Sequence, residues 1–156
     1  RLRAGDGPAM ASSTQAAAPT PMSADAALVT TLAGTAMAFA HDADDEAERW
    51  LRALRLHGQV GCAMQALGVG EVPLEDGGHT GDPPRGGDAV AAAVRDAERR
   101  ARARGGDVVC TADLLDALLA VYGRPLERAL ARRGVTPAEV AERIAAGCDE
   151  AETPAR

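Results

Sequence analysis

The stretch CTADLLDALLAVYGRPLERALARRGV, residues 110–135, indicates the kind of structure that this chain forms. Thr111 is a good helix N-cap, and Asp113 falls in the first turn, where a negative charge is favourable. Leucines fill one face of the turns that follow, Gly123 ends the helix, and Pro125 suits the first turn of the next one. The stretch therefore predicts two helices joined by a tight turn, and it contains no residue set that performs chemistry.

Further helices are predicted on both sides of this pair. Before it, residues 88–104 place apolar residues at helical spacing and end at two glycines. After it, Gly134 closes the second helix, and TPAE at residues 136–139 forms a capping box with proline at the first helical position. The core-facing residues of these helices are predicted to be Ala93, Val94, Ala97, Ala101, Leu114, Leu115, Leu118, Leu119, Leu126, Ala129, Leu130, Val140 and Ile144.

The first half of the chain repeats this scheme with three predicted helices. The first begins after Ser23, the second has an acidic start at Asp45 and Glu48, and the third ends at Gly68. Their apolar residues are, in order, Leu28, Leu32 and Phe39, then Trp50, Leu51 and Leu54, then Val60, Met64 and Leu67. Trp50 and Phe39 are the largest apolar groups, and we expect both in the core rather than at a contact surface.

An internal duplication follows from matching the two halves. WLRAL at 50–54 matches LLDAL at 114–118, and AMQALGV at 63–69 matches ALARRGV at 129–135. One small helical unit cannot bury both faces of its helices, so two copies are expected to pack together. The predicted fold class is all-α, a tandem pseudo-twofold repeat whose first copy is degraded. The predicted boundaries are a disordered tail at 1–22, one domain at 23–148 (repeat one 23–74, linker 75–87, repeat two 88–148) and a tail at 149–156.

Composition excludes several classes of protein. The formal net charge of −6 argues against a nucleic-acid binder, and no stretch approaches the roughly 20 apolar residues of a membrane span. Cys62, Cys110 and Cys148 are widely spaced, which signals neither a zinc site nor a disulfide framework. We therefore expect a soluble cytoplasmic monomer with reduced thiols that binds no membrane and no nucleic acid.

Candidate catalytic and metal-binding residues have simpler interpretations. His41, His57 and His79 could act as bases and Cys62 or Cys110 as nucleophiles, but no spacing pairs them. The acidic run DADDE at 42–46 lacks the ligand spacing of a calcium loop and is better explained as a helix start. The arginines Arg95, Arg99, Arg100, Arg102 and Arg104 fit a solvated helix face better than a surface for an acidic partner or nucleic acid. No catalytic residue, metal or cofactor is predicted.

Residues 25–146 resemble the Clp N-terminal (Clp R) domain of ClpC-type Hsp100 chaperones. The second copy carries TADLLDALL at 111–119 and ALARRGVTPAEVAERI at 129–144, and the first carries AERWLRAL at 47–54 and AMQALGV at 63–69. The resemblance implies a recognition domain that docks adaptors and substrates for an ATP-driven unfoldase. All 17 basic side chains other than histidine are Arg, so a Walker A lysine is absent and the chain would be the receptor domain alone.

The resemblance implies a non-enzymatic protein-binding or peptide-binding module related to Clp proteolysis, acting as an adaptor, decoy or regulator. The alternative is a protein that sequesters a cyclic-peptide antibiotic directed at the Clp chaperone. By position the ligand-binding residues would be Glu48, Arg49, Ala112 and Asp113. Glu48 keeps the family's acidic residue, Ala112 replaces it in repeat two, and Arg49 and Asp113 stand where the family has His. We expect these helix starts to lie near each other, and the alternative is that both acids only cap helices. The fourth helix of repeat one is expected to be missing after Gly68.

Overall fold

The computed structural model describes residues 16–73, 81–148 and 154–155, and these residues form seven α-helices. The helices are α1 (Ala24–Met37), α2 (Ala43–Leu54), α3 (Gly58–Ala66), α4 (Gly86–Ala103), α5 (Thr111–Tyr122), α6 (Arg124–Arg132) and α7 (Pro137–Ala145). Among the described residues, β-structure is limited to two isolated bridges. The predicted all-α class is confirmed. None of the helices in this described part has the length and apolar character needed to cross a membrane.

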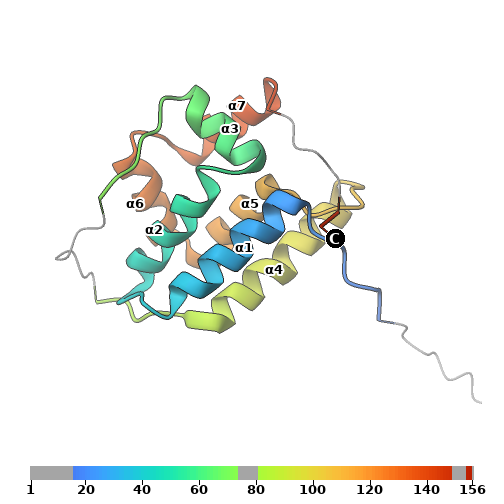
Figure 1. Cartoon of the computed structure of the whole chain (residues 1–156), viewed down its shortest axis with the longest axis horizontal. Helices are drawn as coiled ribbons and strands as arrows, with labels where there is room; N and C mark the ends of the chain where they lie inside the picture. The colour runs from blue at the N-terminus through green and yellow to red at the C-terminus, as the bar shows by residue number, and fades with distance from the viewer. Residues whose placement is uncertain (1–15, 74–80, 149–153, 156) are drawn as a thin grey trace, which may run out of the picture.

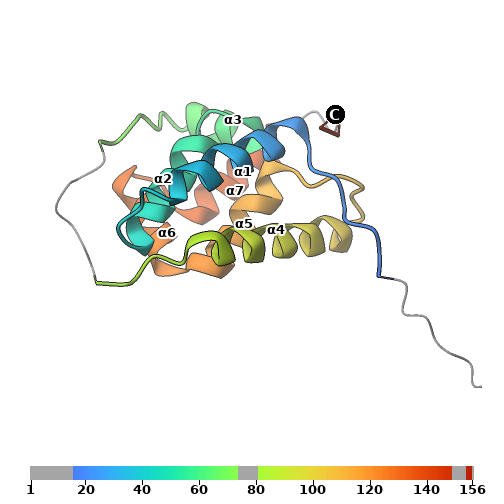
Figure 2. The same ribbon diagram turned by 60° about the horizontal axis from the view of Figure 1, so that its bottom comes forward.

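The helices pack around α5 and α2. In Figure 1, α1 lies between α2 and α4, with α5 behind it. Helices α3 and α7 lie together at the top of Figure 1, and Figure 2 shows α6 beside α2. The two halves of the chain are therefore interleaved, because α2 of the first half contacts α6 of the second and α3 contacts both α5 and α7.

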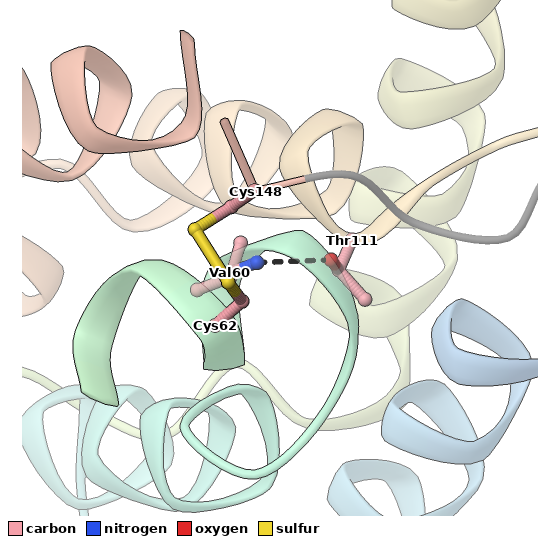
Figure 3. The surroundings of a disulfide bond; sticks show 4 residues. All are labelled: Val60, Cys62, Thr111 and Cys148. Atoms are coloured by element: carbon pink, nitrogen blue, oxygen red, sulfur yellow. Dashed lines mark hydrogen bonds between the residues drawn. A yellow bond between two sulfur atoms is a disulfide. The ribbon is translucent and has the colours of Figure 1, made fainter. Parts of the chain in front are cut away.

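The second half forms the helices that its sequence predicts, but α4 begins at Gly86 rather than at 88, inside the predicted linker, and Val94 is not part of the core. Thr136 and Glu139 form the expected capping box, and Pro125 lies in the first turn of α6. The N-cap of α5 is Cys110, however, and Thr111 is the first helical residue. The Thr111 hydroxyl instead accepts a hydrogen bond of 3.3 Å from the backbone N–H of Val60, which joins the start of α5 to α3 (Figure 3).

Small side chains build the core where helices approach closely. Helix α4 buries alanines at every fourth position, and Leu118 of α5 and Trp50 of α2 are fully buried. Full burial of one such large apolar side chain stabilises a fold by about 1.5–3 kcal/mol. The buried alanines of α4 are Ala89, Ala93, Ala97 and Ala101.

Helix α1 does not bury the residues that the sequence predicts. Leu28 and Leu32 are 43% and 47% exposed, and Phe39, beyond the helix end, is 69% exposed. The buried stripe is instead Ala26, Val29, Ala33 and Met37. Apolar residues occur all around α1, so periodicity did not identify the inward face, and the smaller residues face the neighbouring helices. The prediction that Phe39 is a core residue is wrong, whereas that for Trp50 is confirmed.

The start of α2 lies three residues before the predicted one. Asp42 is the N-cap, and its carboxylate accepts a 2.8 Å hydrogen bond from the N–H of Asp45. Asp44 is therefore the second residue of the helix, the position that Ala112 holds in α5, and Glu48 is the sixth. The acidic run 42–46 is a helix start, as predicted, but Glu48 is not part of it.

Two of the three helix pairs that the predicted duplication relates have equal lengths, whereas α1 has 14 residues and α4 has 18. Helices α2 and α5 have 12 residues each, and α3 and α6 have 9 each. Asp45 and Asp113 are both third in their helices, and each accepts a backbone N–H from just before its helix, that of His41 or Cys110. The sequence match at 50–54 and 114–118 is one helical turn out of this register. The repeat relation itself stays a prediction.

A disulfide contradicts the expectation of reduced thiols. Cys62 in α3 and Cys148 after α7 are joined, with their Cα atoms 5.8 Å apart and a sequence separation of 86 (Figure 3). Cys110 is a buried thiol outside any disulfide. Sequence spacing could not reveal the pair, because only the packing of α3 against α7 brings the two residues together.

The chain ends described by the structure meet beside α5. The Val109 N–H donates to the Pro21 carbonyl at 2.8 Å, and the Ala155 N–H donates to the Met22 carbonyl at 3.0 Å. Residues 21, 22 and 155 therefore take part in these contacts, although the predicted boundaries at 23 and 148 place them in the tails. Residues 69–73 form no helix, as expected for the missing fourth helix. Residues 74–80, which include the first part of the predicted linker, lie outside the described part, as do residues 1–15, 149–153 and 156.

Candidate functional site

An exposed apolar groove lies between α1 and α2. Leu32 and Leu56 are 47% and 55% exposed, and they line a hollow of about 320 Å³. Its other lining residues are Ala36, Arg49, Arg52, Ala53 and His57. We call this hollow the α1–α2 groove. Leu28, one turn before Leu32 on α1, continues the apolar surface beyond it.

Most polar groups at the groove are already paired within the chain. Arg49 donates to both Asp45 oxygens, at 2.9 and 3.4 Å, and to the Phe39 carbonyl. Burial alone would raise the Asp45 pKa, but hydrogen bonds from Arg49 and His41 hold that pKa below its usual value. Arg52 donates to the Val72 carbonyl at 2.9 Å. What the groove offers a ligand is therefore mainly apolar contact, with a cationic rim.

Glu48, a predicted ligand-binding residue, lies in a buried ion pair instead. Its two carboxylate oxygens are 2.7 Å from Arg132 Nη2 and 2.6 Å from Arg133 Nη1, at the end of α6. The side chain of Arg133 is 1% exposed, and its Nε and Nη2 have no hydrogen-bond partner among the described residues. Glu48 thus ties α2 to α6, and its charge is compensated within the fold.

Asp113, the corresponding candidate in α5, is also engaged. Its carboxylate accepts the Cys110 N–H at 2.8 Å and binds Arg104, whose Nη2 lies 2.8 Å from Oδ2. This pairing supports the helix-capping interpretation of Asp113. Ala112 lines a separate hollow of about 230 Å³ between α5 and α7. No contact in the described residues joins Glu48 and Asp113, so the two helix starts do not form a shared polar surface through these side chains.

Asp44 and Glu46, both in the acidic run at 42–46, also join α2 to other parts of the fold. The fully buried Glu46 accepts the backbone N–H groups of Arg85 and Gly86 at 3.0 and 2.6 Å, where α4 begins. Asp44 binds Arg128 of α6 at 2.8 Å. The density of acids in DADDE was the available signal, but it does not tell which helices those acids join.

Tyr122 lies close to the buried Glu46 carboxylate. Burial raises the pKa of the Tyr122 hydroxyl far above its ordinary value, and the Glu46 carboxylate raises it further. The Arg85 guanidinium lies over the Tyr122 ring, 5.5 Å from its centroid. The end of α5 and the start of α4 are thus joined by one buried acid and one aromatic ring.

Three of the candidate catalytic residues are paired with other groups of the fold. Cys62 is in the disulfide, His57 lies 3.9 Å from Asp25, and His41 lies 3.1 Å from Asp45. No group of three His, Cys, Asp or Glu side chains there could hold a metal ion. His79 lies outside the described part.

Comparison with known proteins leaves the family open. No protein-family model matches the chain, and no curated protein matches it either. The resemblance to the Clp N-terminal domain therefore stays a prediction, carried by the quoted residues.

Proposed function

We propose that this chain is a non-enzymatic protein-binding or peptide-binding module related to Clp proteolysis, acting as an adaptor, decoy or regulator. The observation that carries the proposal is the double apolar character of α1. One stripe of the helix is buried in the core, while Leu28 and Leu32 on another face are about half exposed beside Leu56. A helix that is apolar on two faces is typical of one covered on both sides.

The size of the exposed apolar surface indicates how much binding free energy it can supply and how much must come from other contacts. Completing the burial of Leu28, Leu32 and Leu56 would contribute about 1 kcal/mol each, half of the value for a fully buried leucine. A dissociation constant of about 1 μM requires about 8 kcal/mol. The α1–α2 groove therefore serves as the centre of a wider interface, in which a partner's apolar side chain fills the hollow and polar contacts form around it.

The decisive experiment compares two like substitutions. The cell's Clp ATPases, adaptors and protease are quantified after co-purification with the wild-type chain, with Leu32→Glu and with Leu67→Glu. Leu67 is also exposed, at 37%, but lies at the end of α3, so it controls for adding a surface carboxylate. Enrichment of a Clp component that Leu32→Glu abolishes and Leu67→Glu preserves supports the proposal. Absence of every Clp component, or equal retention by both variants, contradicts it.

The same groove bears on the alternative of antibiotic sequestration. Its volume of about 320 Å³ lies at the lower end of pockets that bind small molecules. A cyclic peptide that enters it would raise the melting temperature of the wild-type chain and not that of Leu32→Glu. A flat melting temperature at saturating peptide removes this alternative.

We also propose that the protein is a monomer that binds neither nucleic acid nor membranes and needs no cofactor. A cytoplasmic location was expected partly from reduced thiols. The Cys62–Cys148 bond removes that support, because disulfides persist mainly in oxidising compartments. Thiol titration of protein taken directly from the cell distinguishes the cytoplasm, where the thiols would be reduced, from an oxidising compartment, where the bond would be intact.

A further inference from the structure

A second groove lies along α4, and most of the side chains that line it are charged. Residues 16–22, which we call the strap, run in extended form before α1, and the strap residues Ala17 and Pro19 form one wall. The other wall comes from α4 and includes Arg95, Glu98, Arg99 and Arg102. This open hollow has a volume of about 510 Å³, and we call it the α4 groove.

Hydrogen bonds hold the strap against α4 and against the residues just before α5. Arg102 Nη2 donates to the Ala18 carbonyl at 3.1 Å, which fixes the strap across α4. The Pro21 carbonyl accepts the Val109 N–H, and the Ser23 N–H donates to the Val109 carbonyl at 2.9 Å. The groove is therefore formed by the folded chain itself and needs no partner to exist.

The α4 groove is cationic in a chain of net charge −6. Arg95, Arg99 and Arg102 follow one another at spacings of four and three residues, so they share one helix face. Arg99 pairs with Asp96 and Arg102 with Glu98, but each guanidinium keeps further N–H donors. Arg95 is exposed and takes part in no ion pair among the described residues.

We propose that the α4 groove binds a short acidic peptide segment of a partner protein, whereas the sequence alone favoured a solvated helix face for these arginines. A guanidinium binds a carboxylate through two parallel N–H donors, so Arg95 and Arg99 would receive two acidic side chains of an extended segment. The uncharged wall of Ala17 and Pro19 suits the apolar parts of such a segment. This site does not depend on the α1–α2 groove or on a Clp partner.

Features of the groove favour a peptide over nucleic acid. None of its lining residues is aromatic, so unpaired bases find no stacking surface. Glu98 stands among the arginines, and the acidic chain as a whole repels a long polyanion. A short segment with a few carboxylates meets the local positive charge without this wider repulsion.

The test uses a fluorescein-labelled peptide of six glutamates, a labelled single-stranded oligonucleotide, and fluorescence polarisation with the full chain. The expected result is binding of the glutamate peptide that weakens with added salt. Arg95→Glu should weaken it about tenfold, the effect of one charge-assisted contact and its reversal. Arg143→Glu on α7 applies the same change of charge away from the groove and should have little effect.

Both substituted side chains have solvent access, so both variants should keep the wild-type melting temperature, which verifies that folding is intact. Failure of the glutamate peptide to bind overturns the proposal. Equal weakening by Arg95→Glu and Arg143→Glu overturns it as well, because the attraction would then be a property of the overall charge. Tighter binding of the oligonucleotide overturns it in favour of nucleic acid.

Discussion

Replacing Glu48 by Gln should destabilise the fold strongly, because it leaves a buried arginine without its counter-ion. Glu48 is 9% exposed on its side chain, and the two arginines that it binds are 38% (Arg132) and 1% (Arg133) exposed. The partly exposed pair contributes at most about 1 kcal/mol. Removing one member of a buried pair costs about 3–5 kcal/mol, since the remaining charge is uncompensated. Glu48→Gln should therefore lower the free energy of unfolding by about 3 kcal/mol, because the amide oxygen still accepts one hydrogen bond.

Urea unfolding followed by circular dichroism at neutral pH measures this loss, with Glu142→Gln on the exposed surface of α7 as the control. The control should change the free energy of unfolding by less than about 0.5 kcal/mol. The double variant Glu48→Leu with Arg133→Met removes both charges and should recover most of the stability, because no buried charge remains. A loss below about 1 kcal/mol for Glu48→Gln would refute the assignment of Glu48 to the α2–α6 contact. So would a double variant no more stable than the single one.

Three further changes test the core, the disulfide and the acid dependence. Leu118→Ala should cost about 2–5 kcal/mol in urea unfolding, since Leu118 is fully buried, while the same change at the half-exposed Leu28 should cost less than about 1 kcal/mol; a small loss at Leu118 would place it outside the core. Replacing Cys62 and Cys148 together by Ser, or reducing the wild type, should lower stability by about 4.6 kcal/mol for a bridge with a sequence separation of 86, and identical melting curves with and without reductant would contradict the bond. The Asp45 pKa is held below its ordinary 3.8, so its contribution to stability is present above that pH and is lost as the pH falls through the lower folded value; Asp45→Asn should flatten this acid limb, and an unchanged limb would contradict the Asp45–Arg49 pairing.

The sequence predicted most of the helices because their ends carry local signals. The TPAE capping box, the glycines at 123 and 134 and the Ser23 cap each act within a few residues of the chain, and each ends or starts a helix where expected. Local signals also predicted that Leu118 and Trp50 are core residues. The acidic start of α2 was placed one turn late, because DADDE offers several residues that can cap and only one does.

The parts that sequence did not predict depend on tertiary packing. The inward face of α1 could not be read from a helix that is apolar all round, and the Cys62–Cys148 bond joins residues far apart in the chain. Glu48 and Asp113 were predicted as a binding pair, but Arg132, Arg133 and Arg104 compensate their charges from other helices. Helix packing decides which of the 17 arginines pairs with which acid. Because Glu48 and Asp113 are paired within the fold, we take the α1–α2 groove as the candidate site instead.

Site-specific photo-crosslinking can show whether a Clp component docks in the α1–α2 groove. A photoreactive amino acid is placed at Leu32 in the groove and, as a control, at Leu67 on α3, which is exposed to a similar degree. Each protein is then mixed with the purified Clp ATPase, adaptors and protease of the same cell and irradiated. We expect a crosslink to one of these proteins from position 32 and none from position 67. Crosslinks from position 67 alone, or from neither position, would contradict it.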